Sequence, residues 1–184
     1  YVNQTRNNKP PRQSNVARRA AAREYRLSSN AAPMSAAAVL VDRVLVGIGV
    51  VAYLALLIKV IVQGNFALLL RIVLVTVIGF ALVTVVRARI NAPRPYEVNN
   101  ITPSLGKTTK GKSFPSRHCF SMFIIAFCWL SVSPVVGWAL IVLACVLAVV
   151  RVMGGAHFPR DVVAGALVAL AFWFVGFVLV LPGV

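Results

Sequence analysis

The sequence predicts an all-α fold, an integral membrane bundle of about five transmembrane helices. Of the 184 residues, 59% are hydrophobic and only 12% are charged, about half the charged share of a typical soluble domain. The apolar residues fall into five long runs, and most charged residues lie in the segments before and between these runs. Composition and pattern together exclude an ordinary soluble domain.

The net charge is +15, from 19 Lys and Arg against 4 Asp and Glu. In a membrane protein this excess points to anionic lipid headgroups and phosphate-bearing substrates rather than to nucleic acid. Residues 1–35 form a basic tail. Within it, residues 14–27 are expected either to form a surface helix on anionic lipid or to stay a solvated segment that sets topology. Residues 36–184 are expected to form a single transmembrane domain.

The apolar runs are near the length of about 20 residues that a helix needs to cross the hydrocarbon core. The expected spans are 38–62, 66–86, 116–132, 135–153 and 160–181. The third is short, Gly154 and Gly155 end the fourth, and Pro159 suits the first turn of the fifth. Asp42 and Arg43 lie near the start of the first span, where we expect them to reach the headgroups by snorkelling.

The distribution of charge predicts the orientation of the bundle. With five spans, the tail, the 87–117 segment and the 151–160 segment lie on one side of the membrane. All of the Lys and Arg residues except Lys59 and Arg71 then lie on that side. The positive-inside rule places it in the cytoplasm and the C-terminus opposite. The expected location is a bacterial plasma membrane.

Three polar segments therefore meet at one membrane face: 87–95, 114–118 and 151–161. Guanidinium groups hold a phosphate dianion through paired hydrogen bonds and stay charged at every working pH. Backbone amides at the start of the third span add an anion site. The two histidines of the chain, His118 and His157, can supply a nucleophile and a general acid, and Asp161 can orient the attacking imidazole. These residue types indicate phosphoryl transfer.

The three segments resemble the motifs of the type 2 phosphatidic acid phosphatase (PAP2) family of membrane lipid phosphatases, relatives of vanadium haloperoxidases. The family pattern is Lys, six residues, then Arg-Pro; then Pro-Ser-Gly-His; then Ser-Arg, five residues, His, three residues, Asp. All spacings are kept, and the resemblance runs from about residue 66 to the C-terminal end. The matching residues are Arg87, Arg94, Pro95, Pro115, Ser116, His118, Arg151, His157 and Asp161.

The resemblance implies a role for each matched residue. His157 is expected to be the nucleophile that forms a phosphohistidine, with Asp161 orienting it and His118 as general acid. The expected phosphate-binding residues are Arg87, Arg94, Arg151, Ser116 and Arg117. No cofactor and no metal are expected.

Three positions depart from the family pattern. Arg87 stands for Lys and keeps the charge, and Val150 stands for Ser and loses a hydroxyl that would contact phosphate. Arg117 stands for Gly, and there it either binds a second phosphate or snorkels.

The expected function is hydrolysis of a terminal phosphate from a lipid phosphate, a lipid diphosphate or a prenyl-phosphoryl sugar phosphate in the membrane. A cytoplasmic site favours a substrate of the cytosolic leaflet. A lipid phosphotransferase that uses the same phosphohistidine is the first alternative, and a non-catalytic lipid-binding protein is the second. Anionic headgroups are the expected partners of the tail.

The three cysteines all lie in apolar segments: Cys119, Cys128 and Cys145. Their spacing predicts neither a disulfide framework nor a metal site. Cys119 directly follows His118, but adjacent helix positions point in different directions. We therefore expect Cys119 to be a small core residue.

Overall fold

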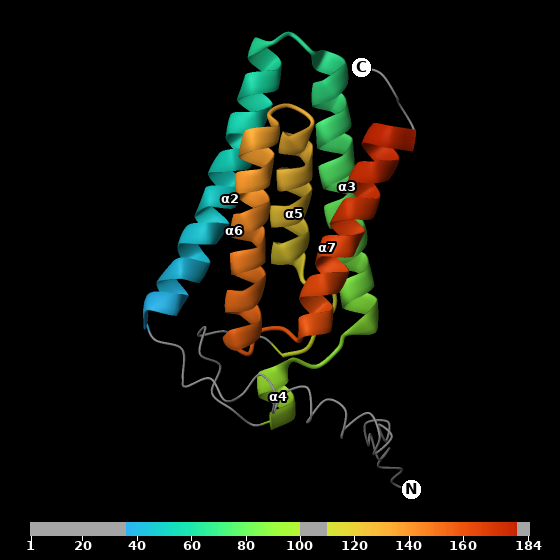
Figure 1. Cartoon of the computed structure of the whole chain (residues 1–184). Coiled ribbons are helices and arrows are strands. Elements are labelled where there is room, and N and C mark those ends of the chain that lie inside the picture. The colour runs from blue at the N-terminus through green and yellow to red at the C-terminus, as the bar shows by residue number, and fades with distance from the viewer. Residues whose placement is uncertain (1–35, 100–109, 180–184) are drawn as a thin grey trace, which may run out of the picture.

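The computed structural model describes residues 36–99 and 110–179, and all regular secondary structure in these two ranges is helical (Figure 1). The elements are α2 (Ala36–Val62), α3 (Phe66–Ile90), α4 (Pro95–Asn99), α5 (Arg117–Leu130), α6 (Pro134–Met153), α7 (Pro159–Phe174) and the π-helix η1 (Val175–Leu179). The predicted all-α membrane bundle is confirmed. The tail and its expected surface helix at residues 14–27 lie outside the described residues.

Local sequence signals place the helix ends. Asn65 caps α3 at its start, and Asn91 ends it in the left-handed conformation with φ 44°, which Asn tolerates better than most residues. Ser116 caps α5. Pro134 and Pro159 begin α6 and α7, where a missing backbone N–H costs nothing.

The boundaries differ from the expected ones in three places. Helix α3 continues to Ile90 rather than ending at residue 86, so Arg87 belongs to its last turn. The segment that follows contains the short helix α4, which the sequence pattern did not predict. The last α-helix ends at Phe174 and continues as η1.

Helix α5 lies at the centre of the bundle and contacts α2, α3, α6 and α7 (Figure 1). Its side chains Phe120 and Ile124 are buried in the core with Leu56, Ile72 and Leu147 from three of the surrounding helices. The outward faces of the surrounding helices are apolar and exposed, as lipid-facing surfaces are. Examples are Leu70, Val77, Trp138, Val142 and Leu167.

Within residues 36–99 and 110–179, four helices are each long and apolar enough to cross a membrane: α2, α3, α6 and α7 with most of η1. The fifth expected span corresponds to the shorter apolar helix α5. Helix α5 has 14 residues, or about 21 Å at 1.5 Å per residue, against a hydrocarbon core of about 30 Å. Because α5 is enclosed by protein, non-helical backbone at its two ends can be satisfied inside the bundle rather than by lipid.

The polar residues gather at the end of the bundle where the short central helix begins. Its N-terminal end is set back from the neighbouring ends of α6 and α7 (Figure 1). Helix α7 approaches it closely at Gly165, where an added Cβ would lie 2.7 Å from the carbonyl oxygen of Ser116. Glycine is therefore required at this crossing, and the backbone N–H of Ser116 donates to the carbonyl of Asp161 at 2.9 Å.

The cysteines behave as core and lipid-facing residues. Cys119 and Cys128 are buried, which confirms the expectation for Cys119, and Cys145 is exposed on the outside of α6.

At the opposite end of the bundle, the guanidinium of Arg71 lies 5.5 Å from the centre of the Phe177 ring.

Candidate functional site

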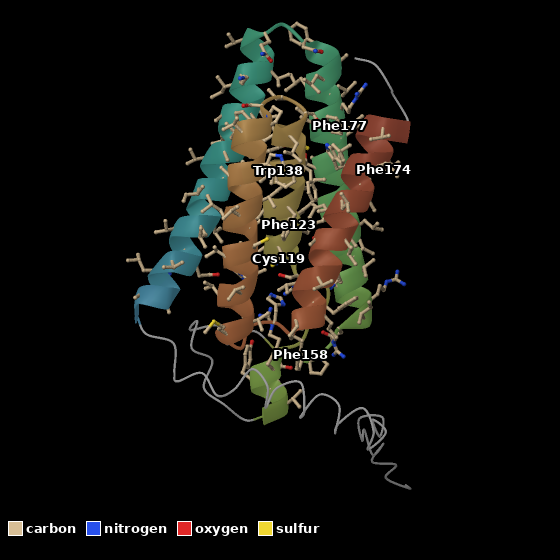
Figure 2. The ribbon with its side chains drawn as sticks, viewed as in Figure 1. Cys119, Phe123, Trp138, Phe158, Phe174 and Phe177 are labelled. Carbon is tan, nitrogen blue, oxygen red and sulfur yellow. The ribbon has the colours of Figure 1, made fainter. Side chains whose placement is uncertain are left out.

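Polar side chains gather at the end of the bundle where α5, α7 and the 110–116 segment meet. Figure 2 shows nitrogen and oxygen atoms clustered between Cys119 and Phe158, whereas Phe174 and Phe177 mark an aromatic region towards the other end. The sequence-predicted residues Arg87, Arg94, Ser116, Arg151, His157 and Asp161 are all buried in this cluster.

Arg151 is held by a carboxylate from another helix. Its side chain is 1% exposed, and Nη2 lies 2.9 Å from Oδ1 and 3.0 Å from Oδ2 of Asp42 on α2. Its Nε and Nη1 have no hydrogen-bond partner among the described residues. Asp42 therefore fixes one edge of the guanidinium and leaves the other donors free for an anion.

Asp42 corrects an expectation from the sequence. It is buried rather than snorkelling to the headgroups, whereas Arg43 is exposed. The physical reason is the pairing with Arg151, because an unpaired charge in this position would be strongly unfavourable. The signal was present in the sequence, since an acidic residue inside an apolar span is a candidate functional residue by itself.

Arg94 and Arg87 are oriented by backbone carbonyls. Nε of Arg94 donates to the carbonyl of Gly111 at 3.0 Å, and its Nη1 is buried without a partner in residues 36–99 and 110–179. Nη1 of Arg87 donates to the carbonyl of Pro115 at 3.1 Å. These bonds tie the end of α3 and the segment after it to the segment that leads into α5.

Glu97 and Ser113 organise the surrounding loop, and neither was predicted to have a role from the sequence. Glu97 accepts hydrogen bonds from the backbone N–H groups of Arg94 and Gly111. The hydroxyl of Ser113 donates to Oδ2 of Asp161. Glu97 could have been noticed as one of only four acidic residues in the chain, but no spacing in the sequence pointed to Ser113.

His157 and Asp161 face each other across the first turn of α7. Nδ1 of His157 lies 3.6 Å from Oδ2 of Asp161, which is longer than a hydrogen bond. The same oxygen accepts from the backbone N–H of Phe158 at 3.0 Å. Since Nδ1 points to the carboxylate, Nε2 is the nitrogen left for chemistry. Such distances often shorten when a substrate binds.

The backbone of His157 is tied to the phosphate-binding candidate Arg151. The carbonyl of Arg151 accepts from the backbone N–H groups of Ala156 at 3.1 Å and His157 at 3.3 Å. Gly155 makes this turn possible with φ 67°, a conformation that favours glycine. The spacing within the 151–161 segment therefore reflects one closed turn, which positions the side chains of both Arg151 and His157.

Burial lowers the pKa of His157 to about 4. Asp161 acts in the opposite direction and raises this pKa, while the positive charges of Arg151 and Arg94 add to the lowering. At neutral pH the imidazole is therefore uncharged, which is the form that a nucleophile needs.

Arg117 and His118 lie at the start of α5. Together with Phe80 and Ser121 they line a cavity of about 150 Å³. The guanidinium of Arg117 lies 5.8 Å from the centre of the Phe80 ring. Ser116 is fully buried, and its hydroxyl lies 3.5 Å from the backbone nitrogen of Cys119 as the helix cap.

Taken together, the buried groups suit a multiply charged oxyanion. Buried charged donors without partners are strongly unfavourable, and Arg94 and Arg151 contribute three such nitrogens, counted over the described residues. An oxyanion bound between these two side chains would satisfy the donors. Among the described residues no group of three or more His, Cys, Asp or Glu could hold a metal ion.

Fold and site thus define an integral membrane protein whose helical bundle encloses an arginine cluster and a His–Asp pair at one end. The sequence model of the PAP2 superfamily matches residues 68–182. The chain belongs to this superfamily.

Two solved structures share the fold. The chain superimposes on the crystal structure of Aquifex aeolicus LpxE with a TM-score of 0.68 and 23% identity, over 84% of this chain and 93% of that one. It superimposes on the PAP2-type phosphatidylglycerolphosphate phosphatase of Bacillus subtilis with a TM-score of 0.64 and 22% identity, over 89% and 86%.

A relative in sequence is the bacitracin transport permease protein BcrC of Bacillus licheniformis. It is 38% identical over 66 residues, which make up 33% of this chain and 32% of that protein. The chain thus matches about a third of the length of this relative.

We predict that Asp42→Asn lowers both stability and phosphate affinity, because it leaves the guanidinium of Arg151 buried and unpaired. Breaking a buried ion pair in this way typically costs about 3–5 kcal/mol. Thermal unfolding in detergent and binding of orthovanadate, an oxyanion that mimics phosphate, measure the two effects. The control is Arg43→Gln, which removes the neighbouring exposed charge.

The double variant Asp42→Asn/Arg151→Gln separates the two effects. Its stability should recover, because no unpaired charge remains, while oxyanion binding should stay lost. If Asp42→Asn matched Arg43→Gln in both measurements, the ion pair would have no part in holding the site.

A second prediction concerns the protonation of His157. Because its pKa is lowered to about 4, NMR of histidine-labelled protein in detergent should show an imidazole that stays neutral down to that pH. The chain has only two histidines, so a His118→Gln variant assigns the signal. Activity should have an acid limb where His157 gains its proton. A midpoint near the ordinary value of about 6.5 would contradict the effect of burial.

Proposed function

We propose that this protein is a membrane lipid phosphatase that removes a terminal phosphate from a lipid phosphate through a phosphohistidine at His157. The observation that carries the proposal is the buried pair of His157 and Asp161, 3.6 Å apart, beside the unpartnered donors of Arg94 and Arg151. A neutral nucleophile next to a cationic oxyanion site is what phosphoryl transfer requires.

In the first step Nε2 of His157 attacks the terminal phosphorus, and the bond from phosphorus to the leaving oxygen breaks. His118 gives its proton to that oxygen, so the lipid departs as an alcohol or a protonated phosphate. Asp161 keeps the other imidazole proton on Nδ1 and stabilises the positive charge that forms on the ring. Arg87, Arg94, Arg151 and Ser116 hold the phosphate oxygens during transfer.

In the second step water attacks the phosphorus of the phosphohistidine. The neutral His118 accepts a proton from this water, the bond between phosphorus and Nε2 breaks, and inorganic phosphate leaves. His157 returns to its neutral form and His118 to its protonated form, so both residues are ready for another cycle. No change of oxidation state occurs in either step.

Two further observations support a lipid substrate. The site lies at one end of a bundle whose sides are apolar and exposed, which suits a substrate that stays anchored in the membrane. One structure that shares the fold is a phosphatidylglycerolphosphate phosphatase, an enzyme whose substrate is itself a lipid phosphate.

We further propose that the site faces the cytoplasm. The described part of the 87–117 segment lies at the same bundle end as the 151–160 segment (Figure 1), and both are rich in Lys and Arg. The positive-inside rule then supports a cytoplasmic site and a substrate from the cytosolic leaflet.

We expect His157→Ala to abolish phosphate release while leaving the fold intact, because the nucleophile is lost and only a small buried cavity is formed. The measurement is release of inorganic phosphate from a panel of lipid phosphates in detergent, with size-exclusion chromatography as the check on folding. Orthovanadate should inhibit the unsubstituted protein. Release at an undiminished rate from the purified variant would rule out the phosphohistidine.

The same assay distinguishes hydrolysis from transfer to a second lipid. A phosphatase yields labelled inorganic phosphate from a terminally labelled substrate, whereas a phosphotransferase yields a labelled second lipid.

The orientation is tested by cysteine labelling of intact cells in a Cys145→Ser background. Cysteine placed at Lys107, on the basic side, should resist a membrane-impermeant reagent, and cysteine placed at Gln63, in the turn between α2 and α3, should react. Labelling at position 107 from outside, with protection at position 63, would show that the orientation is the opposite of the one proposed.

A further inference from the structure

The cavity beside His118 continues towards the lipid. Phe80 and Ser121 line this small cavity and also a larger one of about 350 Å³. The larger cavity has apolar walls, including Val77 and Ile124, and lies between α3 and α5. Val77 and Phe80 are exposed on the outside of the bundle. The shared residues place the two cavities side by side, so a substrate path from His118, past Arg117, would lead to an apolar pocket of a kind that accepts a lipid tail.

Arg117 is electrostatically unfavourable where it stands. It is the first residue of α5, where the helix dipole repels a cation, and its charge also acts against that of Arg87. No carboxylate in the described part of the chain pairs with it. The contact with the Phe80 ring at 5.8 Å offsets only part of this repulsion. An anion in the small cavity would remove it.

The position of the cavity indicates which part of a substrate this anion belongs to. His118, as general acid, faces the leaving oxygen, so the group attached to that oxygen lies beside Arg117. In a simple lipid monophosphate this group is an uncharged carbon, and the cation has nothing to bind. In a lipid with a second phosphate between the terminal phosphate and the tail, an anion lies on this path.

We propose that Arg117 binds a second phosphate on the leaving side of the substrate, so that the enzyme prefers lipids carrying two phosphates over lipid monophosphates. This inference rests on the proposed phosphatase function. When the bond from the terminal phosphorus to the leaving oxygen breaks, His118 protonates that oxygen, and the negative charge of the departing phosphate stays paired with Arg117. Lipid diphosphates and lipids whose second phosphate is a diester share this chemistry.

The test compares substrates with matched tails. Prenyl monophosphate and prenyl diphosphate form one pair, and phosphatidic acid and phosphatidylglycerophosphate form the other. The variants are Arg117→Gly, which restores the residue of the family motif, Arg117→Lys, which keeps the charge, and the control Arg89→Gln, an exposed cation on the last turn of α3. Initial rates of phosphate release give kcat/KM for each combination.

Arg117→Gly should lower kcat/KM about 10- to 100-fold for at least one of the two-phosphate lipids, as expected for loss of a charged hydrogen-bond partner. Its values for the monophosphates should stay within about threefold of the unsubstituted protein, because they place no anion at this position. For the two-phosphate lipids, kcat/KM of Arg117→Lys should fall between the values of the unsubstituted protein and Arg117→Gly. Arg89→Gln should leave kcat/KM unchanged for every substrate. A larger loss with the prenyl diphosphate places the second phosphate next to the first, and a larger loss with phosphatidylglycerophosphate places it further along the path.

Equal losses for all substrates, or no loss for any, would overturn the role of Arg117 while leaving the phosphatase proposal intact. If the unsubstituted protein released phosphate from none of the four lipids, the proposed function itself would fall, and this inference with it. Size-exclusion profiles of both Arg117 variants show whether any general loss comes from misfolding.

Discussion

Asp161 connects the segments from which the site is built, through both its backbone carbonyl and its side-chain carboxylate. Its backbone carbonyl accepts from Ser116, and its side chain accepts from Ser113 and Phe158 while facing His157. The start of α5, the segment before it and the start of α7 are therefore held at one point. This point can form only because α5 is short and because Gly165 lets α7 approach the backbone of α5. Orientation of the nucleophile and packing of the bundle thus depend on the same contacts.

Charge balance explains why the remaining polar residues lie where they do. Arg87, Arg94 and Arg151 are buried at this end of the bundle, where the described residues include only two buried carboxylates, those of Asp42 and Asp161. Gathering like charges in a medium of low dielectric constant is unfavourable, so the backbone carbonyls of Gly111 and Pro115 and the carboxylate of Glu97 stabilise the cluster locally. The remaining positive excess favours the binding of a dianion.

Much of this arrangement could be predicted from the sequence, because motif spacing records local turns. The spacing from Arg151 to His157 and Asp161 reflects a turn closed by hydrogen bonds to the carbonyl of Arg151. The helices of the bundle followed from apolar length alone, although α5 is shorter than the expected span. Contacts between residues that are far apart in the sequence are not reflected in any motif spacing. The pairing of Asp42 with Arg151 joins residues 109 positions apart, and that of Ser113 with Asp161 joins residues 48 apart, so neither has a periodicity to reveal it.

The pairing of Asp42 with Arg151 also has a consequence for how the protein is made. Helix α2, which carries Asp42, lies outside residues 68–182, the part that matches the superfamily. A ribosome produces α2 well before α6, because chains are synthesised from the N-terminus. Until α6 and its Arg151 are synthesised, we expect Asp42 to stay near the membrane surface, where water and headgroups can solvate its carboxylate. The carboxylate can be buried with its partner only once α2 and α6 have packed together, so α2 contributes to the site as well as to the bundle. A chimera that exchanges α2 for an unrelated anchor would insert into the membrane and still lack a complete site.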